Sequence, residues 1–145
     1  MTTEAFDAAA WEEQLIADMR ANGGQPSGGP MAGHPILLMF STGARTGERR
    51  RAILTYSVDG DALVVSGTAS GSKVDPVWVA NITKNSTVEL EVANETYGAT
   101  ATVHRDGPER DRLWNQHVEA LPWFGNYPSQ VGGRVIPVVR LTRRA

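Results

Sequence analysis

The sequence predicts an α+β fold in which about six strands, joined mainly as antiparallel hairpins, close into a small barrel. Two observations carry this prediction. Apolar and polar residues alternate over several short segments that end in turn signals, as in strands with one buried face. Helical patterns precede or interrupt these segments, and no stretch has the composition of an interdomain linker. We therefore expect residues 1–145 to form one domain, long enough to bury its own core.

The N-terminal part predicts a helix followed by an irregular connector. Apolar side chains four residues apart predict a helix over residues 1–22, with Trp11, Leu15 and Met19 in one buried stripe. Residues 23–35 are rich in glycine and proline and cannot form regular structure. They form either a connector or a mobile flap, and we favour a flap because the segment leads directly into an arginine-rich turn.

Six segments have the pattern of strands. They are residues 36–41, 51–58, 62–67, 87–93, 97–103 and 134–141. The sequence Asp-Gly-Asp at 59–61 predicts a hairpin between the second and third of them. Pro137 lies within the last one, which indicates an edge strand or a bulge because proline cannot donate to a ladder.

Two further helices interrupt the strands. Asp75 followed by Pro76 is typical of an N-cap and a first helical position, and predicts a helix over residues 76–84. A third helix is expected from about residue 108 to 121, where apolar residues recur at helical spacing. His117 lies in its buried stripe, so we expect a packed histidine rather than a proton donor.

Composition narrows the function classes. The chain has no cysteine, which excludes disulfides and thiolate metal sites, and its three histidines are scattered, so no metal is expected. No apolar run approaches the ~20 residues of a membrane span. The first residues lack the pattern of a secretory signal, and we expect a cytoplasmic protein. A net charge of −2 argues against nucleic-acid binding.

Residues 41–51, STGARTGERRR, form a turn with four arginines: Arg45, Arg49, Arg50 and Arg51. Strand alternation sends Arg49 and Arg51 to one face and Arg50 to the other. Two glycines let the backbone approach a ligand closely, and arginine forks bind phosphate and carboxylate groups. Two interpretations remain open: an anion site, or a solvated charged loop that keeps a sheet edge soluble.

Two long segments carry a family resemblance. LLMFSTGARTGERRRAIL, followed by GTASGSKVDPVWVANITKNSTVELEV, resembles the deazaflavin (coenzyme F420)-dependent nitroreductase-like oxidoreductases of actinobacteria, and NYPSQ and RVIPVVRL extend the match. The resemblance covers well over half of the chain. It implies a split β-barrel of flavin-binding type, and a reduced deazaflavin held in a groove that delivers a hydride to an electrophilic substrate.

The resemblance also implies cofactor-binding residues. They are Arg45, Thr46 and Arg50 for the phosphate and oligoglutamate tail; Arg51, Ala52, Ile53, Leu54 and Thr55 along the deazaflavin ring; Ser66, Gly67, Thr68 and Ala69 in a small loop; and Val77, Trp78 and Asn81 on the helix that closes the site. The apolar helix face around Trp78 indicates ordinary core packing as the other interpretation for that residue.

Two basic contacts of the family are missing here. Ala44 stands where the family often has arginine, and Ala69 where it often has lysine. Arg49, Arg51 or Lys73 lies close enough in sequence to compensate.

The segment LPWFGNYPSQ supplies candidates for the substrate side. Trp123, Phe124 and Gln130 are expected in the substrate pocket, with Tyr127 and Ser129 as candidate catalytic hydrogen-bond donors. A hydrophobic plug under a loop is the other interpretation of the aromatic group. Gln130 replaces a pocket tyrosine of the nitroimidazole-activating members, so their substrate range is not carried over.

The predicted function is an F420H2-dependent reductase that transfers a hydride to a small-molecule substrate: an activated C=C bond of an enone or lactone, a quinone or a nitro compound. Two alternatives remain open, an FMN-binding oxidoreductase of the same fold and a non-catalytic carrier of a cofactor or ligand. The chain is expected to be a monomer or a homodimer.

Overall fold

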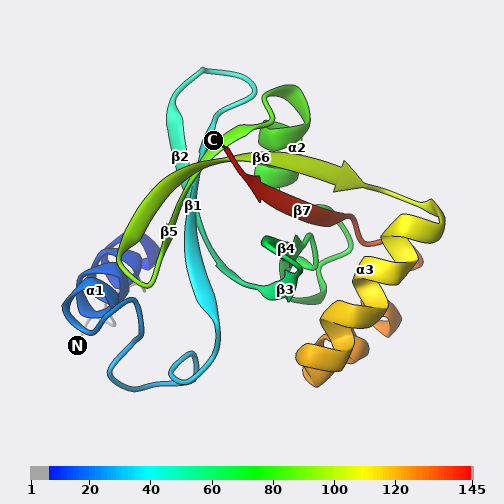
Figure 1. Ribbon diagram of the computed structural model, residues 1–145. Helices are drawn as coiled ribbons and strands as arrows, with labels where there is room; N and C mark the ends of the chain where they lie inside the picture. The colour runs from blue at the N-terminus through cyan, green and yellow to red at the C-terminus, as the bar shows by residue number, and fades with distance from the viewer. Residues whose placement is uncertain (1–6, 145) are drawn as a thin grey trace, which may run out of the picture.

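The computed structural model describes residues 7–144, which contain one seven-stranded antiparallel sheet curled into a partly closed barrel (Figure 1). The strands are β1 (Ile36–Thr42), β2 (Arg49–Thr55), β3 (Ser57–Asp59), β4 (Ala62–Ser66), β5 (Thr87–Val92), β6 (Glu95–His104) and β7 (Val138–Arg143). The helices are α1 (Ala8–Ala21), α2 (Val77–Lys84) and α3 (Gly107–Ala120), with short 3-10 segments η1 (Ala69–Gly71) and η2 (Pro122–Ser129). The α+β barrel prediction is confirmed.

The seventh strand arises because the predicted strand 51–58 bends. It divides into β2 and β3 at Tyr56, whose backbone N–H donates to the Pro35 carbonyl over 2.9 Å. The strand order is β2-β1-β5-β6-β7-β4-β3, so these two consecutive strands form opposite edges of the sheet. One continuous stretch of chain therefore carries both edges, and the bend at Tyr56 closes the barrel.

The prediction for Pro137 is wrong. β7 begins one residue later, at Val138, and lies inside the sheet between β6 and β4. Pro137 therefore precedes the strand, where its missing N–H removes no ladder bond. Its carbonyl accepts a hydrogen bond from the Gly67 N–H over 2.8 Å.

β1 is buried on both faces, which explains its continuous apolar sequence. Leu37 and Met39 point into the barrel core, while Ile36 and Leu38 pack against α1. A third apolar cluster lies under α3 and η2 and includes Trp114, as the sequence predicts. Burial of such side chains is worth about 1.5–3 kcal/mol each, so β1 contributes strongly to the stability of the sheet.

α1 differs from its prediction at one position of the stripe. Met19 is buried and Leu15 partly buried, but Trp11 is 45% exposed and Ile16 takes its place in the contact with β1. The assignment of Trp11 to the core is therefore wrong. The helix begins after Asp7, whose carboxylate accepts from the Ala10 N–H over 3.1 Å. The first six residues of the predicted helix lie outside the described residues.

The N-cap prediction at α2 is also wrong. Pro76, not Asp75, occupies the cap position, and no side chain caps the helix. The Asp75 carboxylate instead pairs with Arg134 over 2.8 Å and Arg105 over 3.1 Å. Two charged partners satisfy the carboxylate better than a single helix N–H would.

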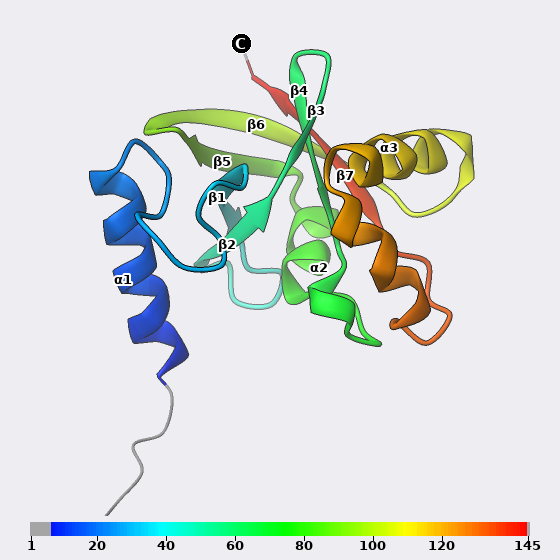
Figure 2. The ribbon, with the colours of Figure 1, turned by 90° about the horizontal axis from the view of Figure 1, so that it is seen from below.

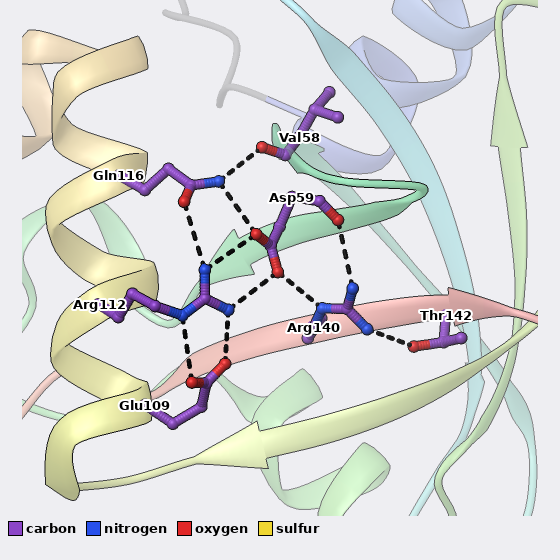
Figure 3. Close-up of polar contacts among 7 residues, drawn as sticks. All are labelled: Val58, Asp59, Glu109, Arg112, Gln116, Arg140 and Thr142. Carbon is purple, nitrogen blue, oxygen red and sulfur yellow. Dashed lines mark hydrogen bonds and ion pairs between the residues drawn. The ribbon is translucent and has the colours of Figure 1, made fainter.

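α3 is fastened to the sheet by an ionic network around Asp59, at the end of β3 (Figure 3). Arg112 of α3 donates to both Asp59 carboxylate oxygens over 3.0 and 3.1 Å and also pairs with Glu109. Arg140 of β7 reaches the same carboxylate over 2.8 Å, and Gln116 donates to it over 3.2 Å. The guanidinium groups, Arg112 first, hold the pKa of Asp59 far below its usual range.

Candidate active site

A cavity of about 310 Å³ opens at one end of the barrel. One wall is β2, the loop from β4 into η1 forms a second, and η2 faces them, with Trp78 of α2 below. The lining residues are Met31, Ala52, Ile53, Leu54, Thr55, Ser66, Thr68, Ala69, Ser70, Trp78, Trp123, Phe124 and Tyr127. We call this space the cavity.

A second, more open hollow of about 450 Å³ lies over the turn between β1 and β2. Its lining residues are Gly43, Ala44, Arg45, Thr46, Arg50, Val77 and Asn81, and we call it the arginine hollow. Figure 2 shows the turn beside α2, with β2 running away from it. Arg50 and Ala52 are near neighbours on β2, as are Val77 and Trp78 on α2, so the same two elements line the arginine hollow and the cavity.

α2 fixes the shape of the turn at Ala44. Asn81, only 4% exposed, accepts from the Ala44 N–H over 2.9 Å, and Lys84 donates to the Ala44 carbonyl over 2.7 Å. Within the turn, the Gly47 N–H donates to the Gly43 carbonyl over 2.9 Å. Side chains of α2 thus bind both the N–H and the carbonyl of Ala44, and they hold the turn that lines the arginine hollow in place.

The arginines divide between two faces as strand alternation predicts. Arg49 pairs with Glu89 over 2.7 Å and its guanidinium lies 4.1 Å from the centre of the Phe40 ring, on the face away from the arginine hollow. Arg51 pairs with Glu13 of α1 over 2.7 Å. Arg50, which lines the arginine hollow, makes only a half-exposed pair with a glutamate of the turn. A bound anion therefore competes with one weak solvent-exposed ion pair.

Arg134 fastens the loop that forms the second wall of the cavity. Its guanidinium donates to the carbonyls of Gly67, Thr68 and Ser72 over 2.9, 3.1 and 3.0 Å, and it pairs with Asp75 over 2.8 Å. The loop needs this support because Ala69 and Ser70 adopt left-handed backbone angles, with φ of 47° and 54°. Sequence reasoning assigned Arg134 only to the start of a strand.

η2 supplies an aromatic wall, as the sequence predicts. Trp123, Phe124 and Tyr127 all line the cavity, and the Phe124 and Tyr127 rings meet edge to face at 5.3 Å. The connector 23–35 reaches the same wall, because the His34 ring lies 4.7 Å from Trp123 and Met31 lines the cavity.

Ser129 and Gln130 do not line the cavity. The Ser129 hydroxyl donates to the Asn126 carbonyl over 3.0 Å. Gln130 packs against Gly71 of η1, whose left-handed φ of 86° favours glycine. Of the two predicted donors, Tyr127 is the one whose side chain reaches the cavity.

Most of the cofactor residues implied by the family resemblance fall in the two hollows. Ala52, Ile53, Leu54, Thr55, Ser66, Thr68, Ala69 and Trp78 line the cavity, and Arg45, Thr46, Arg50, Val77 and Asn81 line the arginine hollow. Arg51 and Gly67 line neither. A Cβ at Gly67 would lie 2.7 Å from Pro137 Cγ, so glycine there permits close packing. Sequence reasoning missed Met31, Ser70 and Arg134, which carry no motif.

His117 lies directly behind the cavity and is fully buried. Its Nδ1 is 2.6 Å from the Ser57 hydroxyl, and its Nε2 is 3.3 Å from the hydroxyl of Ser66, which lines the cavity. Burial lowers the pKa of His117 to about 4, so the ring is neutral at physiological pH.

Residues 11–143 match the family model of the F420H2-dependent quinone reductases. The chain belongs to this family. An F420H2-dependent quinone reductase of Mycobacterium tuberculosis is 38% identical over 112 residues, which cover 76% of this chain and 74% of the relative. The protein is thus an F420H2-dependent oxidoreductase, and reduced coenzyme F420 is its hydride donor.

Two solved structures are similar to this protein in fold as well as in sequence. An F420H2-dependent reductase, FDR-A, has a TM-score of 0.66 at 29% identity and aligns over 74% of this chain and 93% of its own. A chain described as a domain-swapped dimer has a TM-score of 0.69 at 25% identity, over 93% and 99% of the two chains. The split-barrel fold implied by the resemblance is confirmed.

Within residues 7–144, no helix is long and apolar enough to cross a bilayer. No group of three or more histidine and carboxylate side chains in that range is arranged to hold a metal ion.

Proposed function

We propose that this protein reduces quinones, and that it binds F420H2 across the cavity and the arginine hollow. The flat deazaflavin ring would lie along Ala52–Thr55 of β2, and the phosphate and glutamate tail against Arg45, Thr46 and Arg50. The observation that carries the proposal is that β2 and α2 each contribute residues to both spaces. A partly apolar cavity and a cationic hollow lined by the same two elements match a molecule with a planar ring at one end and anionic groups at the other.

The side chains present suit that molecule. Two guanidinium forks and the Thr46 hydroxyl can bind phosphate and carboxylate oxygens with charge-assisted hydrogen bonds. The Arg45 side chain makes no ion pair with any of the described residues, and the pair of Arg50 is half-exposed, so both are available to an anion. The small side chain of Ala69 leaves room for the ring where the family often has lysine.

The reduced cofactor, when bound, supplies the hydride, so the chain itself must bind, orient and exclude water. Trp123 and Phe124 offer flat apolar surfaces against which a planar quinone ring can pack. Tyr127 lies in the same wall, and its hydroxyl is a donor for a quinone oxygen that gains negative charge during reduction.

Quinones are favoured over enones and lactones because the aromatic wall matches a planar ring. The names of relatives favour quinones over nitro compounds. Relatives that resemble this chain over three quarters of its length are named quinone reductases.

The tail-binding role is tested by titrating the protein with F420 and FMN at low and high salt. We expect F420 to bind, and Arg50→Ala to raise its Kd about tenfold at low salt and to weaken the salt dependence. Arg49→Ala is the matched control, because Arg49 pairs with Glu89 on the other face and its loss should leave the Kd unchanged. Binding of FMN in place of F420, or equal effects of the two variants, would overturn the proposal.

The substrate is tested by turnover of a quinone, an enone and a nitroarene with F420H2. The highest kcat/KM is expected for the quinone. Tight F420 binding without oxidation by any of the three would indicate a carrier instead. The cytoplasmic location and the monomeric or homodimeric state expected from the sequence stay predictions, which cell fractionation and analytical ultracentrifugation would test.

A further inference from the structure

The buried contact between His117 and Ser66 is not part of the proposed binding of F420H2 or quinone. Ser66 is the last residue of β4 and lines the cavity, although its residue as a whole is only 7% exposed. Within residues 7–144, His117 is the one hydrogen-bond partner of its hydroxyl. The Ser66 hydroxyl therefore donates its hydrogen bond either to His117 or to a molecule bound in the cavity.

The two distances at His117 distinguish these cases. Bonds that an N–H group donates to an oxygen run from about 2.7 to 3.2 Å. The 2.6 Å contact at Nδ1 is shorter than this range, so Ser57 is its donor, and Nε2, 3.3 Å from the Ser66 hydroxyl, is then the nitrogen that carries the hydrogen and donates to Ser66. A neutral imidazole has one donor and one acceptor nitrogen, so the first assignment requires the second.

We propose that His117 is a positioning residue: its Nε2–H, set by Ser57, holds the Ser66 oxygen so that the serine hydroxyl hydrogen is directed into the cavity, where it donates to a carbonyl oxygen of the bound molecule. The proposal rests on the proposed function, since the molecule is either the deazaflavin, which carries ring carbonyls, or the quinone. No proton leaves Ser66, because the hydroxyl acts only as a hydrogen-bond donor.

The packing around His117 supports a fixed ring. Phe124 lies edge-on to the imidazole at 4.6 Å, and the Trp114 ring is 6.2 Å away. A ring held by aromatic neighbours and two serines has little freedom to rotate, so the direction of the Ser66 hydroxyl is built into the protein before any ligand arrives.

The tautomer is tested first, on the ligand-free protein, by ¹⁵N NMR of the histidine ring. We expect His117 protonated at Nε2 and bare at Nδ1, and expect Ser57→Ala to mix the two tautomers. Protonation at Nδ1 in the wild-type protein would overturn the proposal, whatever the activity. Wild-type protein that shows the expected tautomer but neither binds F420 nor reduces quinones would instead refute the proposed function.

The consequence is tested with Ser66→Ala. A hydrogen bond to a carbonyl in a site of this kind is worth about a tenfold to hundredfold change. If the acceptor is the deazaflavin, the Kd for F420 rises by that factor; if it is the quinone, kcat/KM falls with the Kd unchanged. Ser66→Thr, which keeps the hydroxyl, should recover most of the loss.

Ser57→Ala should reproduce part of the Ser66→Ala effect, although Ser57 does not line the cavity. Ser41→Ala is the control, since Ser41 is equally buried on β1 and lines neither the cavity nor the arginine hollow. Wild-type Kd and kcat/KM in a folded Ser66→Ala variant would overturn the proposal.

Discussion

Replacing Arg134 should weaken one wall of the cavity, the loop between β4 and α2, while leaving the contacts between the barrel strands in place. Its side chain is 15% exposed, and it contributes four contacts to the loop between β4 and α2. Arg134→Met removes the guanidinium but keeps a long apolar stem that can stay in place. Three backbone carbonyls then lose their charged partner, and the Asp75 carboxylate keeps only Arg105.

The expected magnitude follows from those contacts. A hydrogen bond to a charged group contributes about 1.5–3 kcal/mol. The contacts share one side chain and are not additive, and water can reach some of the freed carbonyls. We therefore expect a loss of about 3 kcal/mol in the free energy of unfolding, close to two bonds. The Kd for F420 should also rise at least tenfold, because Thr68, Ala69 and Ser70 form part of the cavity.

Arg105→Met is the matched control, since Arg105 pairs with the same Asp75 but is 53% exposed. An exposed ion pair is worth about 0–1 kcal/mol, so this variant should be close to wild type in both measurements. The assay is urea unfolding followed by intrinsic fluorescence, together with F420 titration. Equal losses for the two variants would refute the reasoning that the carbonyl contacts, rather than the charge on Asp75, fasten the loop.

Two further predictions concern pH. Burial lowers the pKa of His117 from 6.5 to about 4, so as the pH falls the unfolded chain takes up a proton on His117 before the folded protein does. The free energy of unfolding should therefore decrease by about 3 kcal/mol between pH 6.5 and pH 4. Urea unfolding at several pH values should show a flatter profile for His117→Gln, and a slope equal to that of the wild type would contradict the prediction. Asp59, with its pKa lowered by Arg112 and Arg140, acts at lower pH: its contribution is present above about pH 4 and is lost as the pH falls further. Asp59→Asn should lower stability at pH 7 by about 2 kcal/mol and remove the steepest part of the acid transition; an unchanged acid limb would contradict this.

Local patterns in the sequence were sufficient for much of the fold. The run ILLMF predicts a strand, and the structure shows why it is apolar throughout, since α1 covers one face of β1 and the barrel core the other. The bend at Tyr56 was not predictable, because TYSV continues the strand pattern without a break. At the bend, the Tyr56 N–H donates to the Pro35 carbonyl, a partner outside the local segment that no local pattern signals.

The site shows the same division. The turn with Arg45 and Arg50 could be predicted, because glycines and charged residues separate two strand patterns, and both arginines line the arginine hollow; that the turn binds an anion stays a prediction. Arg134 was not, since its partners are carbonyl groups about sixty residues away that have no sequence signature. At Asp75 a local preference is overridden by tertiary contacts. The Asp-Pro dipeptide favours a helix cap, but two arginines bind the Asp75 carboxylate instead.

β2 carries lining residues of both spaces, with Arg50 in the arginine hollow and residues 52–55 in the cavity. Its register against β1 pairs Ser41 with Arg50 and Phe40 with Arg51. A slip of one residue would send Arg50 to the face of Phe40 and bring Arg49 or Arg51 to the arginine hollow. Such a slip would also exchange the packing of Leu54, which contacts the barrel core, and of Ile53, which contacts the cluster between α1 and β1. If the arginine hollow binds an anionic tail as proposed, the apolar residues that set this register are as necessary to that binding as the arginines themselves.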